Sequence, residues 1–414
     1  MIDNIANNFS ISLAGGGIRA SIFASAILEI LDKKYDLTKI KYISGCSGSV
    51  LSILLFYYYN FECNKYYEPG ECIISNLLEL DENTYCHKFL NLKSVSNFFK
   101  SLKDKEDAPL WIKLVKNLFY SCDKNKFTRQ NYPDYIINTT IFYKKIHNEY
   151  YLLEFTRDSC IIPKKIYDVN KNYLFGGYST DFNNFFANKP INYITQAGLS
   201  TNFIEMKFEV ISKGKSNLYE WYLKNPISNA IDEVNLCDSG VYDILGIVSC
   251  LRRKMKNVNV FIFSSVSILD KNFLNNSFET GAYKYFEGND DNNKFTIFTR
   301  EIWNNLYSQL LNKFMNGEPL TVIIKTEILK NEYYDLEPYG EINFLFHITS
   351  LCKNWFNQLP DLTQEIIVKK YNGNFPYLNF IKIKYDAITI NLMYNLIAWE
   401  IQNSKEYELF YENL

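Results

Sequence analysis

Two stretches near the start of the chain decide the fold: residues 9–20 are FSISLAGGGIRA and residues 40–50 are IKYISGCSGSV. In each, a short run with alternating apolar residues leads into a turn of glycine and serine, and apolar residues at helical spacing follow. We therefore expect strand, helix, strand and helix in turn at 9–14, 18–31, 40–44 and 49–59. This order predicts a three-layer α/β fold with a central, mostly parallel sheet and helices on both faces.

The two turns are expected at one edge of that sheet. A strand–helix–strand connection makes its strands parallel, so the loop leaving each strand lies at the carboxyl edge. Gly15–Gly17 leaves the first strand there, and the turn at Ser47 leaves the second. A third segment, 232–237 (DEVNLC), predicts a short strand that ends at Asp238 and precedes a helix at 242–255. If that strand joins the same sheet, Asp238 meets the other loops where open α/β sheets bind ligands.

Ser47 is the candidate nucleophile. It lies in Gly45-Cys46-Ser47-Gly48-Ser49, a turn between a predicted strand and a predicted helix. A nucleophile on such an elbow has a strained backbone and needs small neighbours, which Gly45 and Gly48 provide. The helix that follows directs its positive dipole end at the site. A serine hydroxyl also needs a base that accepts its proton.

Asp238 is the candidate base. A carboxylate buried beside Ser47 has a raised pKa and is able to accept the hydroxyl proton directly. The alternative interpretation is an N-cap for the following helix, because Asp is a preferred capping residue. The two roles are compatible.

Histidine is the other possible base. His347 follows Asp238, so the chain order Ser-Asp-His of a triad is available. However, it lies in the apolar run 344–348 (FLFHI), which predicts a core strand. His87 and His147 precede Asp238 and have polar neighbours.

The glycine-rich turn predicts an anion site. In Gly15-Gly16-Gly17-Ile18-Arg19, backbone N–H groups approach an anion at the start of a helix. In an acyl transfer these donors are able to hold the tetrahedral oxyanion, and Arg19 is able to bind a phosphate through its guanidinium.

A dinucleotide site is the rival interpretation of the same turn, because Gly15-x-Gly17-x-x-Ala20 satisfies the Rossmann pattern. That pattern requires an acidic residue at the end of the second strand. Here the strand ends at 43–45 (ISG), and Asp36 lies only loosely in range. This interpretation is therefore weak.

Composition narrows the function classes. The 44 Lys and Arg nearly balance 46 Asp and Glu, so the sequence predicts no nucleic-acid partner. Nine cysteines without a C-x-x-C pair, together with three histidines, show no metal-ligand spacing. The start carries no basic region of a secretory signal, so we expect a cytoplasmic protein with free thiols. The uncharged stretch Tyr42–Tyr59 contains Ser-Gly-Cys-Ser-Gly-Ser, so we do not interpret it as a membrane span.

The rest of the chain predicts one catalytic domain over 1–414 with an insertion. Residues 60–230 are irregular in pattern and are expected to form an inserted cap, and residues 231–414 complete the core. Within the cap, 110–119 predicts a helix whose apolar face is a candidate membrane contact, although a core-facing helix is the more ordinary interpretation. A strand at 258–264, a hairpin loop at 288–291 and a helix at 388–402 are also expected.

Taken together, the three motifs resemble the cytosolic (group IV) phospholipase A2 family and, more distantly, the patatins. The family pattern is Gly-Gly-Gly-x-Arg-Ala, then Gly-x-Ser-Gly-Ser, then Asp-Ser-Gly or Asp-Ala-Gly. This sequence has Gly15–Ala20, Gly45–Ser49 and Asp238–Gly240 in that order. At two positions, Ser49 and Ser239, the sequence resembles the phospholipase branch more than the patatin branch. A further similarity is the stretch 153–156 (LEFT), which resembles a Glu-Phe-Thr segment of the family's insertion.

The resemblance implies a serine hydrolase that cleaves fatty-acyl esters of phospholipids or lysophospholipids, without a cofactor or metal. Ser47 and Asp238 would form a catalytic dyad, and Gly16 and Gly17 the oxyanion hole. Arg19 would bind the head-group phosphate. The family also has a basic residue before the next strand, for which we choose Arg253 among Arg252, Arg253 and Lys256.

The resemblance also sets the alternatives and the place of action. The nearest alternatives are a transacylase that uses the same acyl-enzyme and a catalytically silent lipid-binding protein of the same fold. No C2 domain is expected before the first strand, so we expect peripheral membrane contact through the cap.

Overall fold

The structure is a computed structural model of the 414-residue chain. It describes residues 8–59, 62–90, 129, 131–142, 150–168, 170–181, 186, 193–201, 220–270, 273, 283–286, 294–379, 382 and 384–412.

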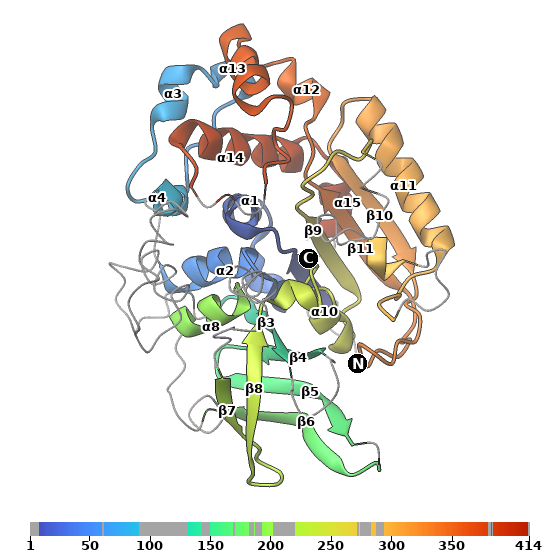
Figure 1. Ribbon diagram of the computed structural model, residues 1–414. Helices are drawn as coiled ribbons and strands as arrows, with labels where there is room; N and C mark the ends of the chain where they lie inside the picture. The colour runs from blue at the N-terminus through green and yellow to red at the C-terminus, as the bar shows by residue number, and fades with distance from the viewer. Residues whose placement is uncertain are drawn as a thin grey trace.

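In the described part of the chain, eleven strands form a single sheet, and helices lie beside its central strands (Figure 1). The strands are β1 (Phe9–Leu13), β2 (Tyr42–Gly45), β3 (Asp134–Phe142), β4 (Tyr150–Phe155), β5 (Ser159–Tyr167), β6 (Tyr173–Asp181), β7 (Glu220–Lys224), β8 (Ile231–Cys237), β9 (Asn257–Ile262), β10 (Leu320–Thr326) and β11 (Ile342–Ile348). The helices are α1 (Gly17–Tyr35), α2 (Ser49–Tyr58), α3 (Ile74–Leu78), α4 (Tyr85–Leu90), α8 (Tyr193–Ser200), α10 (Val248–Arg252), α11 (Arg300–Met315), α12 (Lys353–Phe356), α13 (Asp361–Tyr371), α14 (Ala387–Gln402) and α15 (Lys405–Tyr411).

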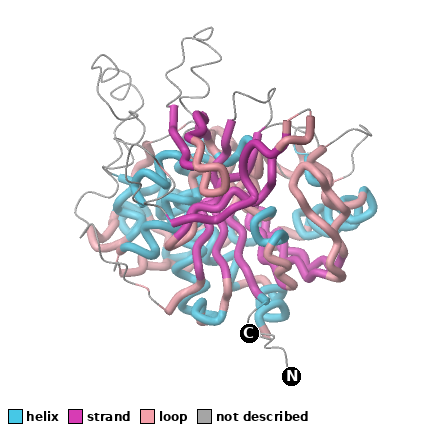
Figure 2. Tube along the Cα trace, turned by 90° about the horizontal axis from the view of Figure 1, so that it is seen from below, coloured by secondary structure: helices cyan, strands magenta, loops and turns pink. Residues whose placement is uncertain are grey.

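The sheet is parallel at its centre and antiparallel toward its edges. The main strand order is β10-β11-β9-β1-β2-β3-β4-β5-β6, and β8 joins at β3 with β7 beside it. Strands β11, β9, β1, β2 and β3 run parallel to one another. Seen along another direction, the strands pass through the middle of the molecule with helices on either side (Figure 2). The α/β class and the layered architecture predicted from the sequence are confirmed.

The elements expected at the start of the chain all form. β1 is buried along its whole length, as expected for a central parallel strand covered on both faces. Every residue of α1 from Ile18 to Leu31 is buried, and this helix packs against α2 and α14. A mostly apolar helix belongs in the interior, and α1 occupies that place (Figure 1). The expected strand at 258–264 and helix at 388–402 correspond to β9 and α14.

Strand β8 joins the sheet in the opposite direction to the central strands. It pairs antiparallel with β3, with Cys237 opposite Thr140. The pairing of β2 with β3 ends earlier on β3, at Gly45 and Ile137. Strand β8 therefore pairs with the part of β3 that extends past the end of β2, and it runs back toward the carboxyl edge of the central strands. The residue that follows β8, Asp238, lies at the same edge as the turns after β1 and β2.

The helix expected at 242–255 is only partly formed, and this prediction needs correction. A 3₁₀ turn spans Ser239–Val241, and α10 begins at Val248. Gly246 has φ +69° between them, and the Asp243 carboxylate accepts the N–H groups of Gly246 (3.1 Å) and Val248 (2.8 Å). An Asp that binds nearby backbone amides competes with the helix, which explains the late start.

Part of the expected cap belongs to the sheet. Strands β3 to β7 lie within 60–230, and β3 pairs directly with β2. The expected helix at 110–119 and the hairpin loop at 288–291 lie outside the described residues. Within the described part of the chain, no helix combines the length and apolar character that crossing a membrane requires.

Candidate active site

The nucleophile candidate Ser47 lies on a sharp elbow between β2 and α2. Its φ is +49°, in the left-handed region that a non-glycine residue rarely adopts. The turn is braced by Ser49, whose Oγ accepts the N–H of Cys46 (3.0 Å) and lies 2.8 Å from the carbonyl oxygen of Leu13 at the end of β1. The backbone strain expected at Ser47 is therefore present, and hydrogen bonds of the neighbouring Ser49 side chain stabilise the turn.

Both glycines beside Ser47 lie in close packing, and Gly48 is the more tightly constrained of the two. A Cβ on Gly45 would lie 2.2 Å from Cδ1 of Ile53, and a Cβ on Gly48 would lie 1.9 Å from the carbonyl oxygen of Gly17. The second contact is with backbone, which has little freedom to move away. The small flanks predicted from the sequence thus have a concrete cause, because the elbow and the glycine-rich turn touch backbone to backbone.

Asp238 lies directly against the nucleophile. The hydroxyl of Ser47 donates to Oδ2 of Asp238 over 2.7 Å, and the N–H of Gly240 donates to Oδ1 over 2.7 Å. Asp238 is 2% exposed and Ser47 is 8% exposed. The second bond also makes Asp238 the N-cap of the 3₁₀ turn that follows. Asp238 therefore contacts Ser47 and caps the turn that follows, and its role as a base stays a prediction.

Burial raises the pKa of Asp238 from 3.8 to about 7, while the hydrogen bonds from Ser47 and Gly240 oppose the rise. Removing the carboxylate from water disfavours its charged form, and this is the larger effect. A pKa near the working pH suits a group that must first accept a proton and then return it.

The glycine-rich turn faces the same place. A Cβ on Gly15 would lie 3.0 Å from Cβ of Ser47, so the turn lies against the nucleophile. The N–H of Gly15 donates to Ile244 (2.8 Å). Among the described residues, no hydrogen bond uses the N–H of Gly16 or Gly17, whose φ values are +143° and +64°. Their role as an oxyanion hole therefore stays a prediction, and no protein acceptor among the described residues competes for these two amides.

Arg19, the expected phosphate ligand, lies inside the protein. Its guanidinium donates to the carbonyl oxygens of Leu378 and Phe263, each over 2.7 Å, and the residue is 1% exposed. Its Nη2 lies beneath the glycine-rich turn, 3.2 Å from where a Cβ on Gly16 would be. In this arrangement Arg19 joins the start of α1 to two distant segments and supports the turn.

Arg253, the second expected phosphate ligand, forms an ion pair with Glu154. Nη2 of Arg253 lies 2.7 Å from Oε2 of Glu154, whose side chain is 1% exposed. The guanidinium also lies over the ring of Tyr42, the first residue of β2, with 5.3 Å to the centroid. Tyr42 is at the start of β2, whereas Ser47 follows the end of β2. Arg253 therefore lies near the end of the strand that is farther from Ser47. The structure does not bring it to the dyad.

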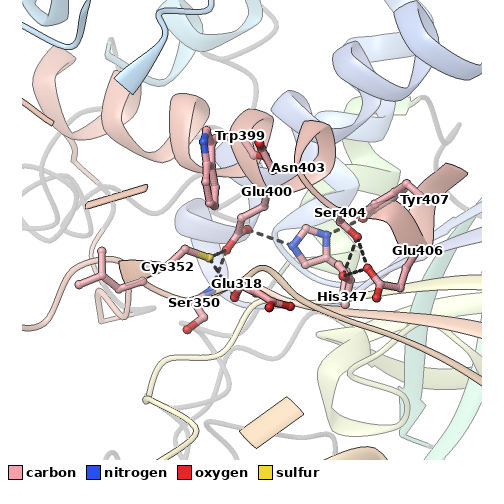
Figure 3. A network of polar contacts seen from close by, with 12 residues as sticks. Glu318, His347, Ser350, Cys352, Trp399, Glu400, Asn403, Ser404, Glu406 and Tyr407 are labelled. Carbon is pink, nitrogen blue, oxygen red and sulfur yellow. Dashed lines mark hydrogen bonds and ion pairs between the residues drawn. The ribbon is translucent and has the colours of Figure 1, made fainter. Parts of the chain in front are cut away.

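His347, the alternative base, belongs to a separate buried network (Figure 3). Its Nδ1 contacts the hydroxyl of Tyr407 (2.5 Å) and its Nε2 contacts Oε2 of Glu400 (3.0 Å). Ser350 and Cys352 donate to the other oxygen of Glu400. Both ring nitrogens are occupied between β11 and the C-terminal helices, while Asp238 contacts Ser47 without an intermediary. The Ser-Asp-His interpretation therefore has no support in the structure.

Ser239 is a contact of the nucleophile that the sequence reasoning did not assign. The backbone N–H of Ser47 donates to Oγ of Ser239 over 2.7 Å. Ser239 follows Asp238 immediately, so one turn supplies both the candidate base and a partner for the strained backbone. The only signal in the sequence was its place in the Asp-Ser-Gly motif.

The described residues contain no group of His, Cys, Asp and Glu side chains arranged to hold a metal ion.

Comparison with known proteins gives a fold relationship. No protein-family model matches the sequence. No curated protein matches it either. Among solved structures, the fold is similar to human GIVD cytosolic phospholipase A2 with a TM-score of 0.54, and to the same protein in complex with methyl gamma-linolenyl fluorophosphonate with a TM-score of 0.50.

The fold is thus similar to that of a cytosolic phospholipase A2. Both comparisons cover 100% of this chain at 11% sequence identity. They cover 61% and 60% of the other chain, so this chain spans about three fifths of the length of the phospholipase structures. At this identity the likeness establishes the phospholipase-like architecture, and the chemistry rests on the geometry at Ser47.

Proposed function

We propose that this protein is a serine lipid acyl hydrolase that cleaves fatty-acyl esters of phospholipids or lysophospholipids. The observation that carries the proposal is the 2.7 Å hydrogen bond from Ser47 to the buried carboxylate of Asp238. A hydroxyl and a carboxylate in this relation, on a strained elbow beside two available amides, form the parts of an acyl-transfer site.

In the first half-reaction, Oγ of Ser47 attacks the ester carbonyl carbon and its proton passes to Asp238. The carbonyl oxygen becomes an oxyanion, which the N–H groups of Gly16 and Gly17 stabilise. Each such donor typically lowers the barrier by about 3–4 kcal/mol. The tetrahedral intermediate then collapses, the bond to the glycerol oxygen breaks, and that oxygen takes the proton from Asp238. The products are an acyl-enzyme on Ser47 and a free alcohol.

In the second half-reaction, water attacks the acyl carbon and gives its proton to Asp238. Collapse of this intermediate breaks the bond to Oγ of Ser47, which recovers the proton, and a fatty acid leaves. A pKa near neutrality allows Asp238 to act as base and then as acid in each half.

The lipid class is supported by the phospholipase A2-like fold together with the three motifs in their expected strand and turn contexts. We propose that the protein acts on lipid at a membrane surface and that parts of 60–230 cover the site. We do not assign head-group binding to Arg19 or Arg253, because each is engaged by buried protein acceptors.

The proposal is tested by fatty-acid release, measured by mass spectrometry, from vesicles of mixed phospholipid and lysophospholipid. We expect release by the wild type, none by Ser47→Ala, and a rate lower by about 10²–10⁴-fold for Asp238→Asn, which keeps the shape and loses the base. A fluorophosphonate probe, which reacts with activated serines, should label wild type at Ser47 and counts active sites.

His347→Gln is the control, because His347 contacts neither member of the dyad, and its turnover per labelled site should equal that of wild type. Equal activity of Asp238→Asn and wild type would refute the dyad. Lipid binding without release or labelling would favour the silent lipid-binding protein, and transfer to an added alcohol would identify a transacylase.

A further inference from the structure

Asn138 is a buried side chain that touches the strand leading into the nucleophile elbow. It lies in β3, is fully buried, and follows directly after the residue of β3 that pairs with Gly45. Its Nδ2 donates to the carbonyl oxygen of Gly45 over 2.8 Å and to Oγ of Ser44 over 2.9 Å. Gly45 is the last residue of β2, two positions before Ser47. The amide thus holds the strand at the point where it turns into the elbow.

The backbone of the same residue reaches the other side of the nucleophile. The carbonyl oxygen of Asn138 accepts a hydrogen bond from the hydroxyl of Ser200 at the end of α8. Oγ of Ser200 lies 3.3 Å from Oγ of Ser239, which accepts the N–H of Ser47 over 2.7 Å. Asn138 is therefore connected to the chain before Ser47 through its side chain and to Ser47 itself through two hydroxyl groups.

Ser249 and the ion pair behind it fix the orientation of the Asn138 amide. Oγ of Ser249 lies 2.6 Å from Oδ1 of Asn138 and 2.7 Å from Oε1 of Glu154. The other oxygen of Glu154 accepts from Arg253 over 2.7 Å, and Arg253 also donates to the carbonyl oxygen of Ser249 over 3.0 Å. A buried carboxylate is stable only when it is paired, and Arg253 pairs it. Ser249 has a single hydroxyl proton for these two acceptors, so it links the amide of Asn138 to Glu154 as a shared donor, while Arg253 holds the backbone of Ser249 in place.

We propose that Asn138 is a positioning residue for Ser47, oriented by Ser249 and by the Glu154–Arg253 ion pair. The inference rests on the proposed function, since it concerns the alignment of Ser47 with Asp238. Ser47 is strained at φ +49°, so its position depends on what holds its two flanks. A displacement of about 1 Å at a reacting group can cost about 10²-fold in rate.

The test compares two isosteric substitutions. Asn138→Asp replaces the donating nitrogen by an oxygen that repels the carbonyl of Gly45, and we expect kcat per labelled site to fall about 10–100-fold with KM changed less than about 2-fold. Asn259→Asp is the matched control, because Asn259 is also a fully buried strand residue but its Nδ2 donates to Tyr411. Its kcat per labelled site should equal that of wild type.

Active sites are counted with the fluorophosphonate probe. A merely structural role for Asn138 would reduce the labelled fraction of protein and leave turnover per labelled site unchanged, which would overturn the inference. An equal fall in Asn259→Asp would overturn it as well. Absence of labelling in the wild type would instead refute the proposed function, so the two failures are distinguishable.

Ser249→Ala is the second variant, for the case in which Asn138→Asp does not fold. It removes one hydroxyl and leaves Asn138, Glu154 and Arg253 in place. We expect kcat per labelled site to fall about 3–10-fold, by loss of alignment, with a melting temperature within about 4 °C of wild type. Unchanged kcat per labelled site in Ser249→Ala would overturn the relay from the ion pair to the amide.

Discussion

At the scale of single residues, Asp238 combines burial with a direct hydrogen bond to Ser47, and this combination affects both the stability of the protein and the pKa of the carboxyl group. Its pKa of about 7 means that the folded protein holds a proton up to neutrality, whereas the unfolded chain releases it near 3.8. Between these values the folded state binds more protons, so the contribution of Asp238 to stability is present at low pH and is lost as pH rises toward 7. For the proposed role of Asp238 as a base, the same raised pKa places its titration near the working pH.

The first prediction concerns pH. Because Asp238 must be ionised to accept the proton, kcat/KM should rise with pH to half its plateau near pH 7 and fall about tenfold per unit well below it. In Asp238→Asn, the free energy of unfolding should exceed that of wild type at pH 8, since the buried charge is gone. Rates from pH 5 to 9 and urea denaturation at pH 8 check both parts. A rate independent of pH across this range would contradict the assignment of the base.

The second prediction concerns Gly48. In Gly48→Ala the new Cβ would lie 1.9 Å from the carbonyl oxygen of Gly17, so the elbow and the glycine-rich turn must separate. Overpacking of this kind costs about 1–3 kcal/mol, and labelling of Ser47 should be lost with it. Gly70→Ala is the control, because its nearest neighbour would be 3.9 Å away. Thermal unfolding and probe labelling of both variants test this prediction, and equal stability and labelling of Gly48→Ala and Gly70→Ala would contradict it.

At the scale of elements, the C-terminal helices α14 and α15 are fastened to the sheet by the buried network around Glu400. This carboxylate, fully buried, accepts from His347, Ser350 and Cys352 (Figure 3). α14 also packs on α1, the helix that begins at the glycine-rich turn. The network therefore stabilises the scaffold of the site without taking part in the chemistry.

The third prediction follows from this arrangement. Glu400→Ala should lower the free energy of unfolding by about 3–5 kcal/mol, because it leaves three buried groups without their acceptor. Glu408→Ala removes an exposed partner of Lys34, 3.8 Å away, and should cost less than about 1 kcal/mol. Denaturation curves measure both, and turnover per labelled site should stay at the wild-type value. A mild effect of Glu400→Ala would show that the helices are held by packing alone.

At the scale of the whole molecule, one extended core encloses most of the cysteines. Seven of the described cysteines are buried, and Cys63 is partly exposed. Burial raises the pKa of thiols such as Cys86 and Cys352, which keeps them protonated and unreactive.

The fourth prediction uses these thiols as reporters of the core. In a Cys122→Ser background, one thiol should react with a thiol reagent faster than the others in the native protein, because Cys63 is less buried than the other described cysteines, and Cys63→Ser should remove that faster reaction. All cysteines should react in guanidinium chloride. Absorbance of the released chromophore follows the reaction, and several fast thiols in the native state would mean that the core opens readily.

Much of the fold was predictable from local pattern. Strand β1, helix α1, strand β2 and helix α2 follow from apolar periodicity and from the glycines at 15–17 and 45–48, because these are local properties. The helix expected at 242–255 shortened to Val248–Arg252, because the carboxylate of Asp243 captured backbone amides that the periodicity does not reveal.

By itself the sequence predicted the architecture and the two candidate site residues, Ser47 and Asp238, since each lies in a recognisable motif directly after a predicted strand. Only the tertiary structure decided which way the Asp238 strand runs: β8 enters antiparallel, and this brings residues 191 positions apart into a 2.7 Å bond. It also decided the partners of Arg19 and Arg253 and the place of Asn138. A charged side chain in a sequence shows its chemistry but not its acceptors, because long-range packing alone sets which carbonyls and carboxylates surround it.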